Sequence, residues 1–159
     1  METVSGGIVV VHAVAALFVL VLGPVQFIRR PKDRVHRYLG RAWLGAMVVT
    51  CVSSFGIMPG GFSWLHGLSL FTLASVSTGW VMARKKQWST HAGCMIGAYV
   101  GTAIAFVFAA AVPTRTIQVT LASAPGLVVA IVGGVVTLAA GAFLAVRQVV
   151  ERSAVQADD

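Results

Sequence analysis

Four histidines are the residues of this chain best suited to chemistry, because each of the first four expected helices carries one of them. Ionisable side chains are costly inside a lipid bilayer, so those that occur there turn toward the protein interior and mark functional positions. A neutral imidazole binds transition metals and haem iron. One histidine per stretch therefore predicts ligands that converge from different helices: His12, His36, His66 and His91.

Membrane-spanning helices are the elements that must position these histidines. The chain of 159 residues is 57% hydrophobic and 11% charged, whereas a soluble domain is about 25% charged. A spanning helix needs about 20 predominantly apolar residues. The sequence predicts an all-α integral membrane protein, with one domain over residues 1–152 and a short polar tail over 153–159. The five expected helices are Gly7–Ile28, Arg34–Ile57, Phe62–Arg84, Thr90–Val112 and Pro125–Arg147.

The ends of the expected helices carry their own signals. Pro31 ends the first helix, since it cannot continue the backbone hydrogen bonds. Asp33 and Ser89 are of the residue types that cap helix N-termini, and we expect them to cap the second and fourth helices. Pro125 suits the first turn of the fifth helix.

The distribution of charge predicts the orientation in the membrane. Cytoplasmic connections carry an excess of Lys and Arg. Eleven basic residues fall on one side of the expected helices, and Arg115 alone falls on the other. We therefore expect the N-terminus outside and the C-terminus in the cytoplasm. Contact with anionic lipid is a secondary role for these residues: Arg29, Arg30, Lys32, Arg34, Arg37, Arg41, Arg84, Lys85, Lys86, Arg147 and Arg152.

The histidines pair by their depth in the membrane. At a rise of about 1.5 Å per residue, His12 lies about 7 Å and His66 about 6 Å below the outer edge. His36 and His91 lie within the first turns of their helices at the inner edge. Mid-membrane polar side chains fall on the same helical stripes as the histidines. We therefore expect the first four helices to form a histidine-lined four-helix bundle, with the fifth, which has no histidine, at its periphery.

Two bis-histidine haem sites would use these pairs, His12 with His66 and His36 with His91. Filling both axial positions favours electron transfer over oxygen chemistry. The two carboxylates of haem require basic partners, for which Arg37 and Arg41 are the candidates at the inner level. A copper or zinc site that recruits nearby Met or Cys residues is an alternative. Histidines that only make hydrogen bonds within the bundle, with no cofactor, are another.

Small residues recur every fourth position on the expected fourth helix. In lipid, such a stripe lets two helix backbones approach closely. We expect these residues to lie in a helix–helix contact of the bundle. The same helices four and five also offer a surface for a partner protein. The stripe consists of Gly93, Gly97, Gly101, Ala105 and Ala109.

Four sequence pieces resemble a family of bacterial membrane proteins, the domain of unknown function 2306. They are His12-Ala13, Gly23-Pro24-Val25-Gln26-Phe27, His36-Arg37-Tyr38-Leu39-Gly40-Arg41, and His91 followed by Met95. The resemblance implies a membrane protein of the bacterial cytoplasmic membrane and no particular activity. In the family the fourth-helix piece continues His-Arg-Arg, whereas here it reads His91-Ala92-Gly93. The alternation of histidines along the helices is also similar to transmembrane dihaem b-type cytochromes.

These observations favour a haem b protein that relays electrons, in contact with the lipid bilayer and with a membrane redox partner or a second copy of itself. A cofactor-free membrane subunit is the alternative from another class, and a small-molecule or ion carrier is a third. No acidic residue lies within the five stretches, which leaves a carboxylate-coupled carrier without a candidate residue. The chain has no nucleophile–base pair typical of an enzyme, and no basic face typical of nucleic-acid binding.

Overall fold

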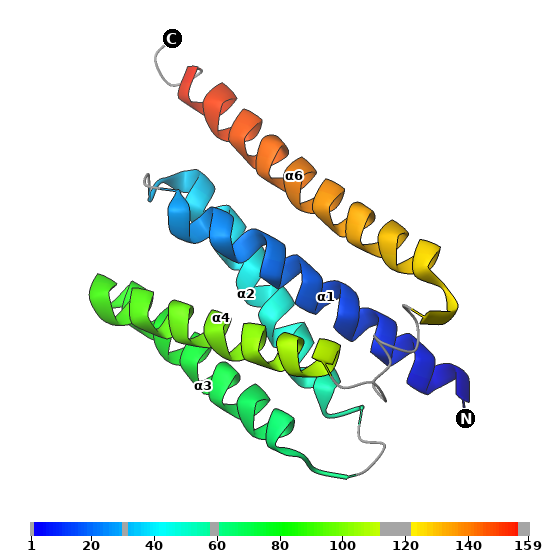
Figure 1. Ribbon diagram of the computed structural model, residues 1–159. Coiled ribbons are helices and arrows are strands. Elements are labelled where there is room, and N and C mark those ends of the chain that lie inside the picture. Colours follow the sequence, from blue (N-terminus) through cyan, green and yellow to red (C-terminus); the bar gives the residue numbers. More distant parts are fainter. Residues whose placement is uncertain (1, 30–31, 58–60, 112–121, 156–159) are drawn as a thin grey trace.

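A computed structural model of the protein describes residues 2–29, 32–57, 61–111 and 122–155. Within these ranges the chain forms helices and no strand, which confirms the all-α prediction. Consecutive helices run in opposite directions (Figure 1). The helices are α1 (Glu2–Ile28), α2 (Arg34–Ser54), α3 (Trp64–Arg84), α4 (Trp88–Ala111) and α6 (Pro125–Val155).

The first four helices close into a ring. Helix α1 contacts α2 and α4, and α3 contacts the same two helices. Helix α6 contacts only α1 and α2 among the described helices, and lies on the side of the ring away from α3 (Figure 1). The helix without a histidine is thus at the periphery, as the sequence predicts.

The interior of this ring is mainly apolar. Its fully buried apolar side chains include Val19, Leu22, Leu39, Trp43, Met47, Val76 and Ala98. Among the histidines, His66 is buried and 5% exposed, whereas the other three are half-buried. Lining of the bundle by all four histidines therefore stays a prediction.

The predicted helix ends agree with the structure in part. Asp33 is the N-cap of α2, and its side chain accepts a backbone N–H 3.1 Å away. Pro125 is the first residue of α6. The prediction for Ser89 is wrong, because α4 begins at Trp88 and already includes it. Helix α3 is capped instead by Ser63, which the sequence analysis did not single out.

Helix α6 is longer than expected. It continues through Val155, so residues 153–155 are helical, and 156–159 lie outside the described residues. Its 31 residues span about 46 Å at 1.5 Å per residue. Because the hydrocarbon core is about 30 Å thick, part of α6 extends beyond it if the helix crosses the bilayer steeply.

Three of the helices contain a segment long and apolar enough to cross a membrane. These segments are Gly6–Ile28, Trp88–Ala111 and Val128–Ala145. Helices α2 and α3 do not reach that level of hydropathy, since α2 begins with arginines and α3 carries several serines and threonines. Each has 21 residues, about 32 Å, which is close to the membrane thickness. Spanning by α2 and α3 stays a prediction.

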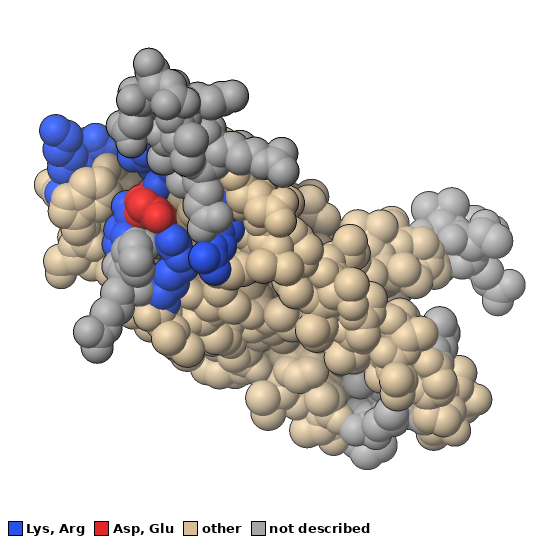
Figure 2. Space-filling model, turned by 90° about the horizontal axis from the view of Figure 1, so that it is seen from above, with Lys and Arg blue, Asp and Glu red and all other residues tan. Residues whose placement is uncertain are grey.

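The basic side chains gather at one end of the molecule (Figure 2). This end holds the α1–α2 and α3–α4 connections, opposite the N-terminus (Figure 1). Arg115 lies outside the described residues. Clustering at one end agrees with the charge asymmetry used to predict orientation. The described members are Arg29, Lys32, Arg34, Arg37, Arg41, Arg84, Lys85, Lys86 and Arg147.

The glycine stripe of α4 does not pack as expected. A Cβ atom added to Gly93 or Gly97 would meet nothing within 4 Å, so the predicted close contact within the bundle is wrong for both. Of the three glycines in the stripe, Gly101 faces a neighbouring helix, with Thr72 Oγ1 3.4 Å from the added atom. Gly93 and Gly97 turn outward because the face of α4 that holds Ala98 and Thr102 is the buried one.

Candidate functional site

The segment from Gly23 to Phe27 lies where α1 meets α2 and α4. Pro24 has no N–H, so the carbonyl of Leu20 lacks its helical donor. The Tyr99 hydroxyl of α4 donates to that carbonyl oxygen at 3.3 Å. The Trp43 indole of α2 donates to the neighbouring Val19 carbonyl oxygen at 3.0 Å. Side chains from two other helices thus hold α1 at its proline.

Gly23 makes room for these two donors. A Cβ added to it would lie 2.6 Å from ring atoms of Tyr99 and 3.4 Å from Nε1 of Trp43. Phe27, one turn further, packs edge-on against both rings, with centroids 5.3 Å from Tyr99 and 6.4 Å from Trp43. The Gly-Pro-x-Gln-Phe segment of α1 therefore lies at a junction where side chains of three helices, α1, α2 and α4, pack against one another.

Gln26 connects this junction to the histidine of α2. Its side chain is 5% exposed, and its Nε2 donates to the backbone carbonyl of His36 at 3.1 Å. A Cβ added to Gly40 would lie 3.2 Å from that nitrogen, so a small residue there leaves space for the amide. Both motif pieces thus meet at one place.

Two polar atoms at this place are buried without a hydrogen-bond partner among the described residues. They are Oε1 of Gln26 and Nδ1 of His36. A buried polar atom left unpaired costs about 1–3 kcal/mol, and native proteins keep few of them. Such atoms mark a place where a water or a bound group completes the hydrogen bonds.

The inner-level histidines lie on helices α2 and α4, whose backbones do not contact each other among the described helices. Nδ1 of His91 is 2.9 Å from the carbonyl oxygen of Gly79. Because a carbonyl only accepts, this nitrogen carries the proton, and the lone pair of the neutral ring is on Nε2. His91 is thus in the tautomer that metal-binding histidines use.

Gly79 permits this arrangement. An added Cβ would overlap the end of Met95 and lie 3.0 Å from Cβ of Cys94. Neither Gly79 nor Tyr99 was singled out by sequence reasoning. A proline inside a spanning helix does require an external donor for the freed carbonyl, and that requirement could have prompted a search for Tyr99.

At the outer level the two histidines differ. Nδ1 of His12 lies 2.9 Å from the carbonyl oxygen of Thr50 and 3.1 Å from Oγ of Ser53, which gives His12 the same tautomer as His91. Nδ1 of His66 instead accepts the backbone N–H of Ser63 at 2.9 Å. The proton of neutral His66 is therefore on Nε2.

Helices α1 and α3, which carry His12 and His66, do not contact each other among the described elements. The ring of His66 lies between two phenylalanines, with centroids 5.7 Å from Phe55 and 5.2 Å from Phe62. Pairing of His12 with His66 stays a prediction.

The charged side chains around the α1–α2 connection are in part already engaged. Arg29 donates two hydrogen bonds to the Asp33 carboxylate, at 2.7 and 2.9 Å, which holds the pKa of that carboxyl well below its usual range. Lys32 Nζ donates to the carbonyl oxygens of Gln26 and Arg29 at the end of α1. The predicted haem partners Arg37 and Arg41 are exposed on the outer face of α2.

The structure offers less support for a copper or zinc site that uses cysteine. Cys51 is buried and Cys94 half-buried, both as free thiols. Within the described ranges no three or more His, Cys, Asp or Glu residues gather as a metal site would require. This observation does not bear on a site that uses two histidines.

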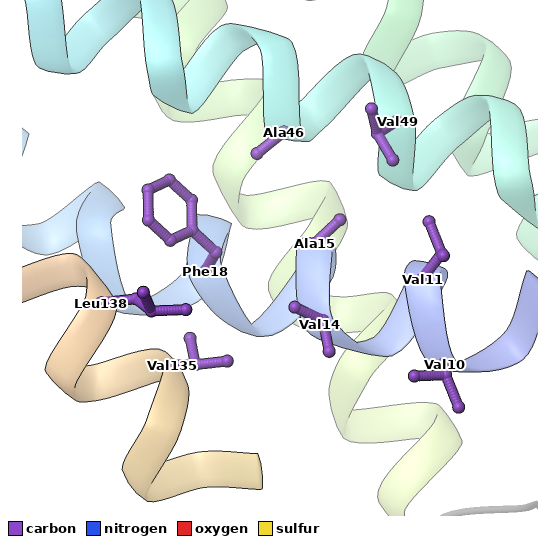
Figure 3. Close-up of a pocket in the computed structure, with 9 residues that line it drawn as sticks. All are labelled: Val10, Val11, Val14, Ala15, Phe18, Ala46, Val49, Val135 and Leu138. Carbon is purple, nitrogen blue, oxygen red and sulfur yellow. The ribbon is translucent and has the colours of Figure 1, made fainter. Parts of the chain in front are cut away.

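A cavity of about 360 Å³ lies between α1, α2 and α6. Most of its lining comes from α1, with Ala46 and Val49 from α2 and Val135 and Leu138 from α6 (Figure 3). Apolar cavities offer no group for chemistry and stay dry, so we separate it from the candidate site. Its lining is Val10, Val11, Val14, Ala15, Phe18, Ala46, Val49, Val135 and Leu138.

A family model described as Predicted membrane protein (DUF2306) matches residues 9–146. The chain belongs to this family. The matched part of this DUF2306 member contains all four histidines and both motif pieces that meet at Gln26. The family description states a membrane protein and names no activity or ligand. Comparison with curated proteins and with solved structures finds no match.

Proposed function

We propose that this protein is a multi-pass protein of the bacterial cytoplasmic membrane that binds b-type haem and relays electrons. At the inner site, His36 of α2 and His91 of α4 would hold the haem iron. The observation that carries the proposal is that the Gly79 carbonyl holds His91 in the metal-binding tautomer. The proposal rests on ligand chemistry.

The residues of the inner level fit haem chemically. Haem held by two imidazoles would supply reversible one-electron transfer with no open position for oxygen. The Gly79 carbonyl keeps the Nε2 lone pair of His91 available. Oε1 of Gln26 and Nδ1 of His36 are both buried without a partner among the described residues. The Nδ1–H of a ligating His36 would need an acceptor, which Oε1 of Gln26 would supply only after one of the two side chains shifts.

The acidic groups of haem need positive charge nearby. Arg37 and Arg41, the candidates from sequence, are exposed on α2. Arg29 is already bound to the Asp33 carboxylate and Lys32 to two backbone carbonyl oxygens.

An absorption spectrum of protein expressed with ample haem supply tests the proposal. We expect sharp α and β bands after dithionite reduction and no ready binding of carbon monoxide. His36→Ala and His91→Ala should each remove the same portion of the spectrum. Thr137→Ala, an exposed change on α6, is the control that should leave it intact. A folded but colourless wild-type protein would rule out haem binding.

A second haem at the outer level, with His12 and His66 as ligands, is a separate part of the proposal. His12 already has the suitable tautomer. His66 would have to give up its hydrogen bond from Ser63 or shift its proton, so we expect this haem to be lost more easily than the inner one. His12→Ala and His66→Ala should then each remove a second portion of the spectrum.

A cofactor-free membrane subunit is the second candidate, and the outward face of α4 favours it. Gly93 and Gly97 leave open space on this face, and small residues allow close approach of another helix in lipid. Under this alternative, Gly97→Leu should weaken association with a partner or a second copy while the thermal stability of the monomer stays unchanged. Association can be followed by cross-linking in membranes.

A further inference from the structure

The outer face of α2 carries a charged stripe at its beginning. Arg34, Arg37, Tyr38 and Arg41 are all exposed, and their spacing of three and four residues places them on one side of the helix. The Arg41 guanidinium lies 5.9 Å from the centroid of the Tyr38 ring. This face looks away from the ring interior, where Leu39 and Trp43 are buried.

Among the side chains that the structure describes, no carboxylate is left to neutralise the charge of this stripe. Asp33 is the only acidic residue whose side chain the structure describes, and it binds Arg29 through both carboxylate oxygens. Arg41 follows Arg34 by seven residues, about 10 Å along the helix. An arginine at that depth below the membrane surface is costly unless it reaches the surface or finds an anion.

Beyond Arg41 the same face becomes apolar. Gly45, Val48 and Val52 are exposed and continue the spacing of the stripe. A Cβ added to Gly45 would meet nothing within 4 Å, so open space lies beside the helix backbone there. One helix face thus presents cations at one end, a glycine without a side chain, and then an apolar surface.

We propose that this face binds an anionic phospholipid, with its phosphate at Arg37 and Arg41 and an acyl chain along Gly45, Val48 and Val52. Side chains four residues apart on a helix have Cβ atoms about 5–6 Å apart, a separation that lets two guanidinium groups hold one phosphate from both sides. Arginine binds phosphate through paired N–H groups. The combination of a phosphate site and an apolar surface on one face selects a lipid over a free anion.

Native mass spectrometry of the detergent-purified protein tests this site. Protein mixed with phosphatidylglycerol and phosphatidylcholine should retain the former, and added phosphatidylglycerol should raise the unfolding temperature. Arg37→Gln combined with Arg41→Gln should weaken retention roughly tenfold or more. Gly45→Leu fills the open space beside the backbone without changing charge and should also weaken retention.

Lys85→Gln combined with Lys86→Gln is the matched control, because it removes the same charge from the same end of the molecule. It should retain phosphatidylglycerol like the wild type. Equal loss in this control would mean that general charge attraction suffices. An equal rise in unfolding temperature with inorganic phosphate would indicate a free-anion site. Unchanged retention in the Gly45 variant, or in a folded arginine variant, would also overturn the proposal.

Discussion

The Tyr99 hydroxyl donates a hydrogen bond to the carbonyl oxygen of Leu20, 3.3 Å away, and that carbonyl is the one Pro24 leaves without a helical donor. Tyr99→Phe should therefore destabilise the protein by roughly 1 kcal/mol. In a Pro24→Ala background the helix supplies the missing N–H, so the same change should cost less. Unfolding in detergent measures both differences, and an equal cost in the two backgrounds would contradict this explanation.

Gly23 and Gly97 should respond in opposite ways to alanine. Gly23→Ala places a methyl group against the Tyr99 ring, and such overpacking costs about 1–3 kcal/mol. Gly97→Ala enters open space and improves helix propensity by up to about 1 kcal/mol. Thermal unfolding of the two variants in the same detergent gives the comparison. A similar loss of stability in both would mean that Gly97 is packed after all.

Gln26→Met should separate haem positioning from general packing. Methionine keeps the length of the side chain but removes the hydrogen bond to the His36 carbonyl and the buried acceptor. We expect roughly tenfold weaker haem retention, as for other partners that orient a ligating histidine, and a shifted midpoint potential. Gln87→Met, an exposed amide, is the control. If Gln26→Met leaves the midpoint potential and the haem retention unchanged, Gln26 does not position the ligating histidine.

Asp33 should make the folding stability of the protein decrease at low pH. Its folded-state pKa is lowered, mainly by the hydrogen bond from Arg29, so its contribution is full above its unfolded pKa of about 3.9 and is lost as the pH falls through the folded value. Asp33→Ala also removes the N-cap and should cost about 1 kcal/mol at neutral pH. Asp33→Asn keeps the cap. The stability difference between wild type and Asp33→Asn should shrink below about pH 4, and a constant difference would argue against this assignment.

Orientation in the membrane can be tested with fusions. We expect a reporter that is active only in the cytoplasm to give signal after Asp159 and none when inserted at Gly60. The reason is the gathering of basic residues at the end opposite the N-terminus (Figure 2), together with their excess on the cytoplasmic side of membrane proteins. The reverse pattern would exchange the inner and outer histidine levels.

Sequence reasoning predicted the helices well because their signals are local. Apolar length, the N-cap at Asp33 and the proline at position 125 all act within a turn or two of the helix they define. The sequence also singled out Gln26, His36 and Gly40 as motif residues. It could not show that they meet, since a helical stripe indicates which face is buried and not which side chain lies opposite.

The difference at Gly97 and the local partner of His66 have the same origin. Gly97 belongs to a regular small-residue stripe, but the burial of Ala98 and Thr102 turns Gly97 outward. His66 lies on the expected inward face and is buried, yet its ring nitrogen is used by the neighbouring Ser63. Which face of a helix is buried, and which group bonds a ring nitrogen, depends on neighbouring atoms only a few ångströms away. The spacing of residues along the chain does not show where those atoms lie.

The junction at Pro24 also has a consequence for the time course of synthesis. Tyr99 follows Leu20 by 79 residues, and at about 5–20 residues per second a ribosome needs roughly 4–16 s to make that length of chain. During this interval α1 has been made but the donor for its freed carbonyl has not. The nascent helix must therefore rely on water, lipid headgroups or the insertion machinery until α4 emerges and completes the junction.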